Sequence, residues 1–86
     1  MKLRSDFIVQ EIDGTQFLVP VGQQSFNGIV RNNPTAAFII NCLRQDTSAE
    51  QIVDAMCETY DAPRATIAAD VEKALDTLRG IGALQE

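Results

Sequence analysis

The dipeptide Asn33-Pro34 divides the chain into two parts that differ in hydrophobic periodicity. Before it, β-branched and aromatic segments are separated by turn residues, as in half-buried strands. After it, apolar residues recur every three or four positions, the spacing of amphipathic helices. Asn can cap the free amides of a first helical turn, and Pro at the next position loses no hydrogen bond. We therefore expect an α+β chain in which strands come first and helices follow.

Three strands are predicted in the first part of the chain. Residues 7–12 and 16–21 flank Asp13-Gly14-Thr15, which favours a hairpin turn. The alternate apolar residues of the second segment share one face: Phe17, Val19 and Val21. A shorter segment, residues 26–31, follows a polar connection. The pattern predicts a three-stranded antiparallel meander, which needs helices to cover one of its faces.

Three helices are predicted in the second part. The first extends from Pro34 to about Gln45. The second begins with a capping box in which Thr47 is the cap and Glu50 reaches back to it. Both begin at a residue whose side chain can accept from free backbone N–H groups, so the two starts are well defined.

The third helix is expected to begin after Asp61, which would cap it ahead of Pro63. Gly80 or Gly82 ends it, with Gly82 favoured, through a left-handed cap. Its apolar positions form one stripe: Ile67, Val71, Ala74, Leu75 and Leu78. The predicted order is three strands and then three helices in a single domain, residues 1–86.

Composition excludes several classes of function. The net charge is −5 and the basic residues are scattered, whereas a nucleic-acid surface needs clustered Lys and Arg. No apolar run approaches the ~20 residues of a membrane span. The chain has no histidine and no Gly-rich phosphate loop, so we predict that it is not an enzyme and has no catalytic residue, cofactor or metal site. Partners are therefore expected to be neither nucleic acid nor membrane.

The two cysteines, Cys42 and Cys57, each lie among apolar helical positions. A disulfide framework in a small secreted domain uses four or more cysteines, so two reduced thiols in a cytoplasmic protein are the expectation. A bridge between the two helices stays open as an alternative. The N-terminus has a basic start without the apolar stretch of a signal peptide.

Three segments resemble PqqD-like proteins in order and spacing, over residues 7–86. They are FNGIVRNNPTAAF (residues 26–38), DTSAEQIV (residues 46–53), and Asp70-Val71 with Leu75, Leu78 and the ending Gly82-Ala83-Leu84. Asn32 stands where that family commonly has an apolar residue, and Ile40 stands where an aromatic is frequent.

The resemblance implies a winged-helix-like fold and a peptide-recognition role in the biosynthesis of ribosomally made, modified peptides. The leader of a precursor peptide would add as a strand to the third β-strand, beside the third helix. A modifying enzyme, often a radical SAM maturase, would then act on the bound precursor. On this basis the predicted peptide-binding residues are Ile29, Val30, Arg31, Asn32, Asp70, Lys73, Ala74 and Thr77.

Several alternatives remain open at this point. Asp70 can fix its helix by an internal hydrogen bond, Ala74 can be ordinary helix packing, and Arg31 can protect the strand edge from aggregation. A winged helix can also bind DNA through its third helix, and an adaptor can dock through the acidic residues Glu50, Asp54 and Glu58. The oligomeric state is expected to be a monomer or a strand-exchanged dimer.

Overall fold

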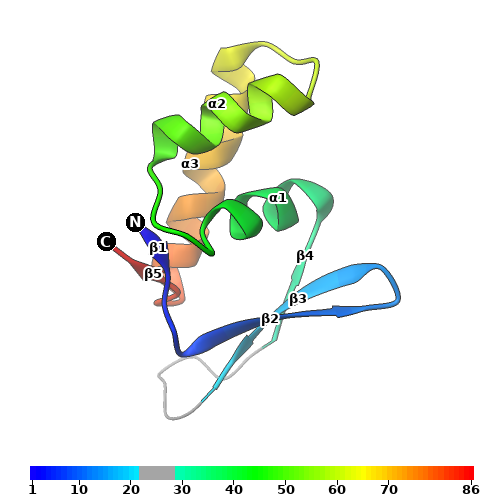
Figure 1. Cartoon of the computed structure of the whole chain (residues 1–86), viewed down its shortest axis with the longest axis vertical. Coiled ribbons are helices and arrows are strands. Elements are labelled where there is room, and N and C mark those ends of the chain that lie inside the picture. Colours follow the sequence, from blue (N-terminus) through cyan, green and yellow to red (C-terminus); the bar gives the residue numbers. More distant parts are fainter. Residues whose placement is uncertain (22–28) are drawn as a thin grey trace.

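The computed structural model describes residues 1–21 and 29–86. A small sheet lies on one side of the molecule and the helices lie together on the other (Figure 1). The elements in chain order are β1 (Lys2–Leu3), β2 (Phe7–Ile12), β3 (Thr15–Pro20), β4 (Val30–Asn32), α1 (Pro34–Cys42), α2 (Ala49–Thr59), α3 (Arg64–Gly80) and β5 (Leu84–Gln85).

The predicted hairpin is confirmed. β2 and β3 pair antiparallel from Phe7↔Pro20 to Ile12↔Thr15, so the two residues between them form the turn. Asp13 and Gly14 both have positive φ, 52° and 78°, as a two-residue type I′ turn requires. This turn matches the right-handed twist of the strands, and the hairpin projects as a wing beyond the helices (Figure 1).

The apolar alternation on β3 lies on the outer face of the sheet. Leu18 and Gln16 are buried against the helices, whereas Phe17 and Val19 are half-buried and Val21 is exposed. On β2, Phe7 supplies the other fully buried contact at the inner face. The sheet therefore contributes few side chains to the core, and its outer face remains partly apolar.

The third strand is shorter and later than predicted. It is β4, which pairs with β3 from Gln16↔Asn32 to Leu18↔Val30. Residues 26–28 of the predicted segment lie outside the described residues, and Ile29 precedes the strand. The predicted bounds are wrong at Ile29 and Asn32, because β-branched and aromatic residues mark strand propensity but not where pairing begins.

Two of the three helix starts needed correction. α1 begins as predicted, since the Asn33 side chain accepts from the Ala36 N–H at 2.8 Å, but it ends at Cys42, short of Gln45. α2 is capped by Ser48, whose hydroxyl accepts from the Gln51 N–H at 3.2 Å. Thr47 is one residue too early, and its hydroxyl donates to the Gln51 side chain instead.

α3 also begins at a later residue than predicted. Pro63 occupies the N-cap position with φ −59° and ψ 140°, and no side chain caps the helix. Asp61 is two residues further back, so it is not the cap. Pro63 also lacks an N–H of its own, and its fixed φ leads the chain into the first turn at Arg64.

The end of α3 confirms the predicted left-handed cap at Gly82, where φ is 75°. The Gly82 N–H donates to the Arg79 carbonyl at 3.1 Å, and the Ala83 N–H donates to the Leu78 carbonyl at 2.9 Å. These two bonds form a Schellman motif, which turns the chain back and buries Ala83. After this turn β5 pairs antiparallel with β1, a pairing that was not predicted.

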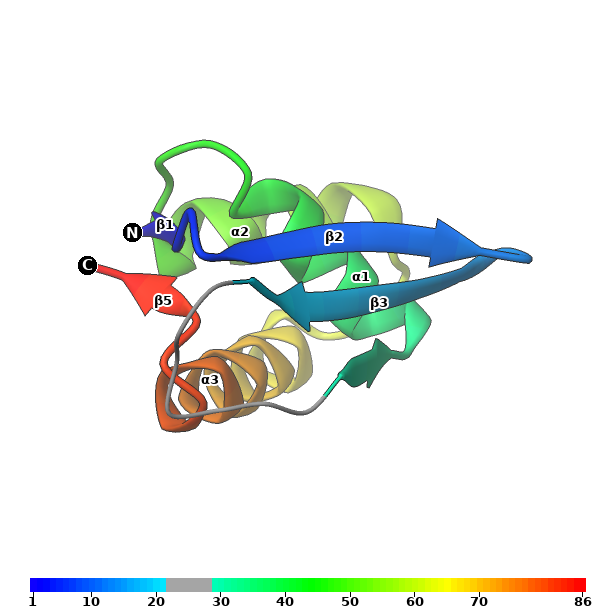
Figure 2. The same cartoon turned by 90° about the horizontal axis from the view of Figure 1, so that it is seen from below.

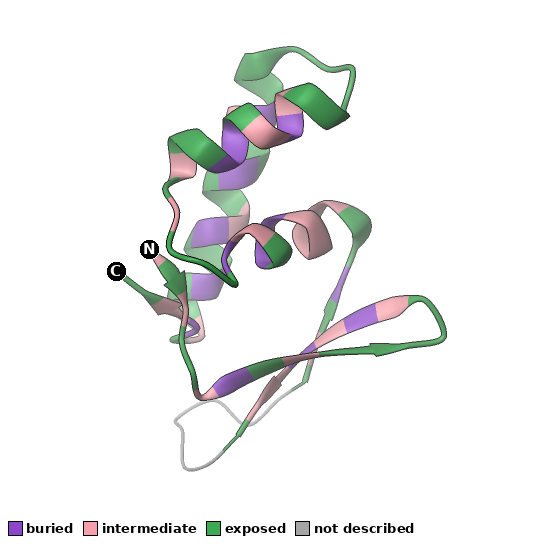
Figure 3. Ribbon diagram, viewed as in Figure 1, coloured by how far each residue is buried: buried purple, intermediate pink, exposed green. Residues whose placement is uncertain are grey.

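The core lies among the three helices and extends to the inner face of the sheet (Figure 3). Its largest fully buried side chains are Leu18, Ile39, Ile40, Leu43, Ile52, Leu75 and Val71. Most of them come from the three helices, which pack on one another and cover the strands. Because β4 follows the hairpin and leads straight into α1, it lies at the margin of this core.

Candidate functional site

The site begins with an unpaired strand edge. The strand order is β2-β3-β4, so β4 has a partner on one side alone among the described residues. Hydrogen bonding alternates along an antiparallel pair, and the two-residue turn fixes the alternation along β3. Phe17 then bonds toward β2, and Arg31, which lies opposite Phe17, points its N–H and C=O away from β3. A fourth strand can pair at that edge.

A groove of about 400 Å³ lies along this edge, between β4 and α3, with α1 beneath it. Figure 2 shows β4 separated from α3 on the side that faces the viewer. The groove is lined by Val30, Arg31, Asn32, Asn33, Thr35, Ala36, Ile39, Ile40, Asp70, Lys73, Ala74, Thr77, Leu78 and Ile81. An open strand edge and a groove therefore occur side by side.

The structure brings together seven of the eight residues predicted for peptide binding. Ile29 is the exception, because it precedes β4, has 66% of its surface exposed and does not line the groove. On α3, the flank predicted to border the groove carries Asp70, Lys73 and Thr77, and all three line it. Ala74, which was predicted to belong to the apolar stripe, is half-buried: it packs against the core and also lines the groove.

The sequence analysis missed the contribution of α1 to the groove. Ile39 and Ile40 are fully buried and form part of its floor, while Thr35 and Ala36 line it near the start of the helix. The signal was available in the chain order. α1 begins directly after β4, so its first turns must lie next to the end of that strand.

The charged residues of the groove have no partners within residues 1–21 and 29–86. Arg31, Lys73 and Asp70 make no ion pair or hydrogen bond through their side chains there. The internal hydrogen bond considered for Asp70 is thus not observed. By contrast, Arg64 donates to Asp54 at 2.7 Å on the face formed by α2 and α3. Among the described residues, the groove therefore holds two cations and one carboxylate whose side chains are unpaired.

Asn32 is buried at the inner end of the groove, and the structure explains how a polar side chain is accommodated there. Its amide donates to the Gln16 side chain at 2.8 Å, directly across the β3–β4 pair. Gln16 in turn donates to the Asn41 side chain at 3.3 Å. This amide chain joins β3, β4 and α1, and it holds the free strand at a defined position above the helix.

A second hollow, of about 680 Å³, lies between the hairpin tip and α1. Its lining is polar and includes Glu11, Thr15, Gln16 and Asn41. It is larger than the groove, but it lies at the hairpin tip and α3 does not line it, so it lacks the helix wall that the groove places beside β4. The groove is the better candidate site for an extended ligand.

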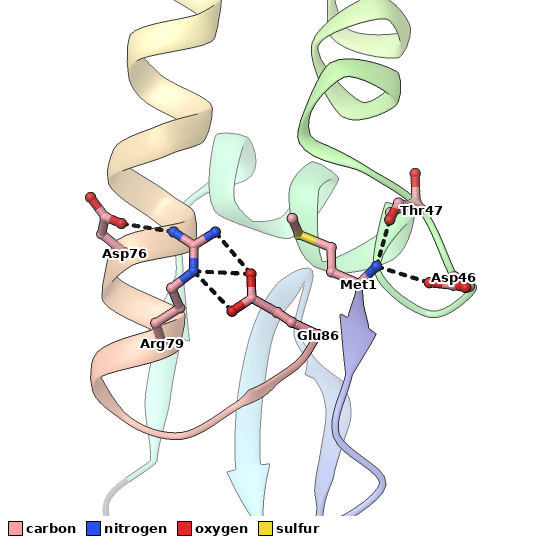
Figure 4. Close-up of polar contacts among 6 residues, drawn as sticks. All are labelled: Met1, Asp46, Thr47, Asp76, Arg79 and Glu86. Carbon is pink, nitrogen blue, oxygen red and sulfur yellow. Dashed lines mark hydrogen bonds and ion pairs between the residues drawn. The ribbon is translucent and has the colours of Figure 1, made fainter.

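The other end of the molecule is closed by polar contacts (Figure 4). The Met1 amino group donates to the Asp46 carboxylate at 2.9 Å and to the Thr47 carbonyl at 2.7 Å, and this hydrogen bond lowers the pKa of Asp46. The Arg79 guanidinium donates to Glu86 at 3.0 Å and lowers the pKa of that carboxyl group. Both contacts flank the β1–β5 pair.

Other kinds of site find little support. Within the part of the chain that the structure describes, no three His, Cys, Asp or Glu residues are grouped so that they could hold a metal ion. No described helix is both long and apolar enough to cross a membrane. Cys42 and Cys57 are free and half-buried, and burial raises the pKa of the Cys42 thiol.

Comparison with known families identifies the chain. The model of the family described as coenzyme PQQ synthesis protein D (PqqD) matches residues 17–84, from β3 to the start of β5. The chain belongs to the PqqD family. The resemblance noted in the sequence is thereby confirmed, and it extends over both walls of the groove. A search of the curated proteins found no match.

A search of the solved structures found the PqqD-like fold of this chain in TbiB1, which was solved in complex with the TbiA(beta) leader peptide. The TM-score is 0.85 at 24% sequence identity, and the alignment covers 99% of this chain and 95% of that chain. A likeness at this identity establishes the fold. The predicted α+β architecture, with a three-stranded antiparallel sheet followed by three helices, is confirmed.

Proposed function

We propose that this PqqD-family chain is a non-catalytic peptide-binding protein that captures the leader of a ribosomally made precursor peptide. The leader pairs as an added strand with the free edge of β4, and its inward side chains enter the groove beside α3. The bound precursor is then presented to a modifying enzyme, and a radical SAM maturase is the enzyme class we expect. Capture and presentation take place in the cytoplasm.

The observation that carries this proposal is the open β4 edge next to a groove of about 400 Å³. Backbone pairing gives affinity for any extended segment, and the groove supplies selectivity. TbiB1, which shares the fold, was solved with a leader peptide, and this supports the same class of ligand here. The net charge of −5 and the unclustered cations argue against the alternative of DNA binding.

The expected affinity is moderate. An unstructured leader loses about 2–5 kcal/mol of the gross interaction energy when it becomes ordered. The remaining free energy of a short interface corresponds to a dissociation constant on the order of micromolar. A carrier needs no tighter binding, because the precursor must move on to the enzyme.

The direct test is a titration of the isotope-labelled protein with the synthetic leader of a precursor peptide encoded beside its gene, followed by NMR. We expect saturable chemical-shift changes that map to β4 and the groove face of α3. Changes confined to the acidic face of α2 would instead favour the adaptor alternative. The absence of saturable binding to any such leader would overturn the proposal.

Two pairs of variants sharpen this test. Arg31→Pro removes the backbone N–H that points away from β3, and an edge strand tolerates Pro at such a position. Arg31→Ala removes the same side chain but keeps the N–H, so the difference in affinity between the two reports strand pairing. Ala74→Leu fills the groove, while Ala69→Leu adds the same volume at an exposed position of α3 outside it. We expect Arg31→Pro and Ala74→Leu to weaken binding more than their controls.

A further inference from the structure

We propose that the segment bound at β4 carries an acidic side chain opposite Arg31, on the outer face of the sheet, between two side chains that enter the groove. This inference rests on the proposed function and specifies the class of peptide that the site selects. Recognition would then take place on both faces of the added strand.

The strand register decides on which face of the sheet the guest residue opposite Arg31 lies. Side chains directly opposite each other on neighbouring strands point to the same face of a sheet. Gln10 pairs with Phe17, and Phe17 pairs with Arg31, so these three form a row across the outer face. A guest residue that bonds to the outward N–H and C=O of Arg31 continues this row, about 5.5 Å from Arg31 between Cα atoms. Its side chain therefore points outward beside the guanidinium.

Arg31 differs from three other arginines of the chain in its ion pairing. Arg4, Arg64 and Arg79 each form an ion pair with a carboxylate of this chain. Arg31 is exposed and forms none with the described residues. The other two members of its row, Gln10 and Phe17, carry no charge. Within this acidic chain, the guanidinium of Arg31 remains available to a carboxylate supplied by the guest.

Glu11 on β2 is a carboxylate of this chain that would compete with an acidic guest residue for Arg31. It borders the polar hollow that Arg31 also borders, but it lies opposite Gln16, at a position that faces the inner side of the sheet. No ion pair joins Glu11 to Arg31. An acidic guest residue on the outer face would therefore meet an unpaired cation.

The guest residues on either side of the acidic one face the groove, because side chains alternate along a strand. β4 runs opposite to α3, so its Val30 end lies toward the C-terminal half of that helix (Figures 1 and 2). The guest side chain beside Val30 would meet Ala74 and Leu78, an apolar part of the lining. The preferred pattern there is apolar and then acidic, read from the Val30 end of β4.

The guest residue on the other side of the acidic one lies next to Asn32. This part of the groove is polar, since Asp70 and Lys73 line it from α3. A polar side chain fits there better than an apolar one, because burying either charge under an apolar group without a partner is costly. The selected class is therefore an extended segment that pairs antiparallel with β4 and has, from its N-terminus, a polar, an acidic and an apolar residue in succession.

The experiment is a selection from a displayed library of random linear peptides against the full chain and against its Arg31→Glu variant. We expect the native protein to enrich Asp or Glu next to an apolar residue, and Arg31→Glu to enrich Lys or Arg at that same position. Identical enrichment with both proteins would overturn the inference and leave the proposed function standing. Recovery of no binding peptide with the native protein would overturn the proposed function itself.

A double-mutant cycle provides the quantitative test. For a selected peptide, reversing its acidic residue to Lys should weaken binding by up to about fivefold, as should Arg31→Glu, and combining the two should restore most of the loss. Arg44→Glu is the matched control, because Arg44 is exposed, unpaired among the described residues and outside the groove. If Arg31 merely protects the edge, the two changes will be additive and the inference fails. Thermal melting of each variant checks that it is folded.

Discussion

Asn32 and Gln16 are the buried polar side chains of the described core. They lie opposite each other on β4 and β3, and a 2.8 Å hydrogen bond joins their amides. A paired buried amide adds little net stability, but leaving one of the two without its partner is costly. The pair therefore specifies one alignment of β4 on β3, since a shift by one residue would put Asn32 on the outer face.

Replacing one member of this pair should destabilise the protein more than replacing both. We expect Asn32→Leu to lower the free energy of unfolding by about 1–3 kcal/mol, because a buried amide loses its partner. Adding Gln16→Leu should recover most of that loss, since two apolar side chains can then pack together. Urea denaturation of the two single variants and the double variant measures the coupling. Losses that simply add would contradict this account.

The sequence could indicate that Asn32 was unusual, but it could not reveal why. Its partner Gln16 is distant along the chain, and so is Asn41, to which Gln16 donates in turn. The first contact depends on strand register, and the second depends on how α1 packs. Local patterns carry neither kind of information. The same holds for the groove lining from α1, which follows from packing and not from the helical periodicity.

At the scale of single elements, local chemistry predicted which segments form helices better than where they begin. Thr47 and Ser48 are adjacent residues with hydroxyl groups, and Thr47 matches the sequence pattern of a capping box. Their backbone conformations decide between them, and Ser48 has the extended φ and ψ of an N-cap, −134° and 162°. The cap therefore depends on how the chain enters the helix from α1.

This correction can be tested by two alanine substitutions. Ser48→Ala should lower the free energy of unfolding by about 1 kcal/mol, because the Gln51 N–H loses its acceptor. Thr47→Ala should cost less, since it removes one exposed side-chain contact. Chemical denaturation of both variants decides which residue is the cap, and a larger loss for Thr47→Ala would contradict the structure.

The two glycines at the end of α3 should respond in opposite directions to the same substitution. Gly82→Ala should destabilise the protein by about 1–2 kcal/mol, because φ of 75° is unfavourable for a residue with a Cβ. Gly80→Ala should stabilise it by about 0.5–1 kcal/mol, because Gly80 is helical. An added Cβ meets no atom within 4 Å at either position, so the contrast reflects the backbone alone. Thermal melting of both variants tests the sign of each change.

For the whole molecule, the sequence predicted the order of the elements and the family, but not the pairing of β1 with β5. That sheet joins residues from the two ends of the chain, and each strand is two residues long. Such short segments have no periodicity to detect. They become strands because the Schellman turn at Gly82 directs the chain back toward Leu3.

The ion pairs beside this sheet predict a weakening in acid. The pKa of Asp46 lies below its ordinary value of 3.8, and that of Glu86 lies below 4.5. Their stabilising effect is therefore complete above these ordinary values and is lost as the pH falls through the lowered ones. The combined variant Asp46→Asn and Glu86→Gln should be less stable than the native protein at neutral pH, and this difference should shrink toward zero in acid. Denaturation across this pH range measures it, and a constant difference would contradict the prediction.

The shortness of β4 has a consequence for how long a guest remains bound. The strand spans Val30–Asn32, and Arg31 alone within it directs its backbone groups outward. A guest strand that is held by so few main-chain hydrogen bonds can separate from β4 without any other part of the fold moving. Dissociation should accordingly be rapid, and one molecule of this protein could deliver many successive precursors instead of being consumed by the first.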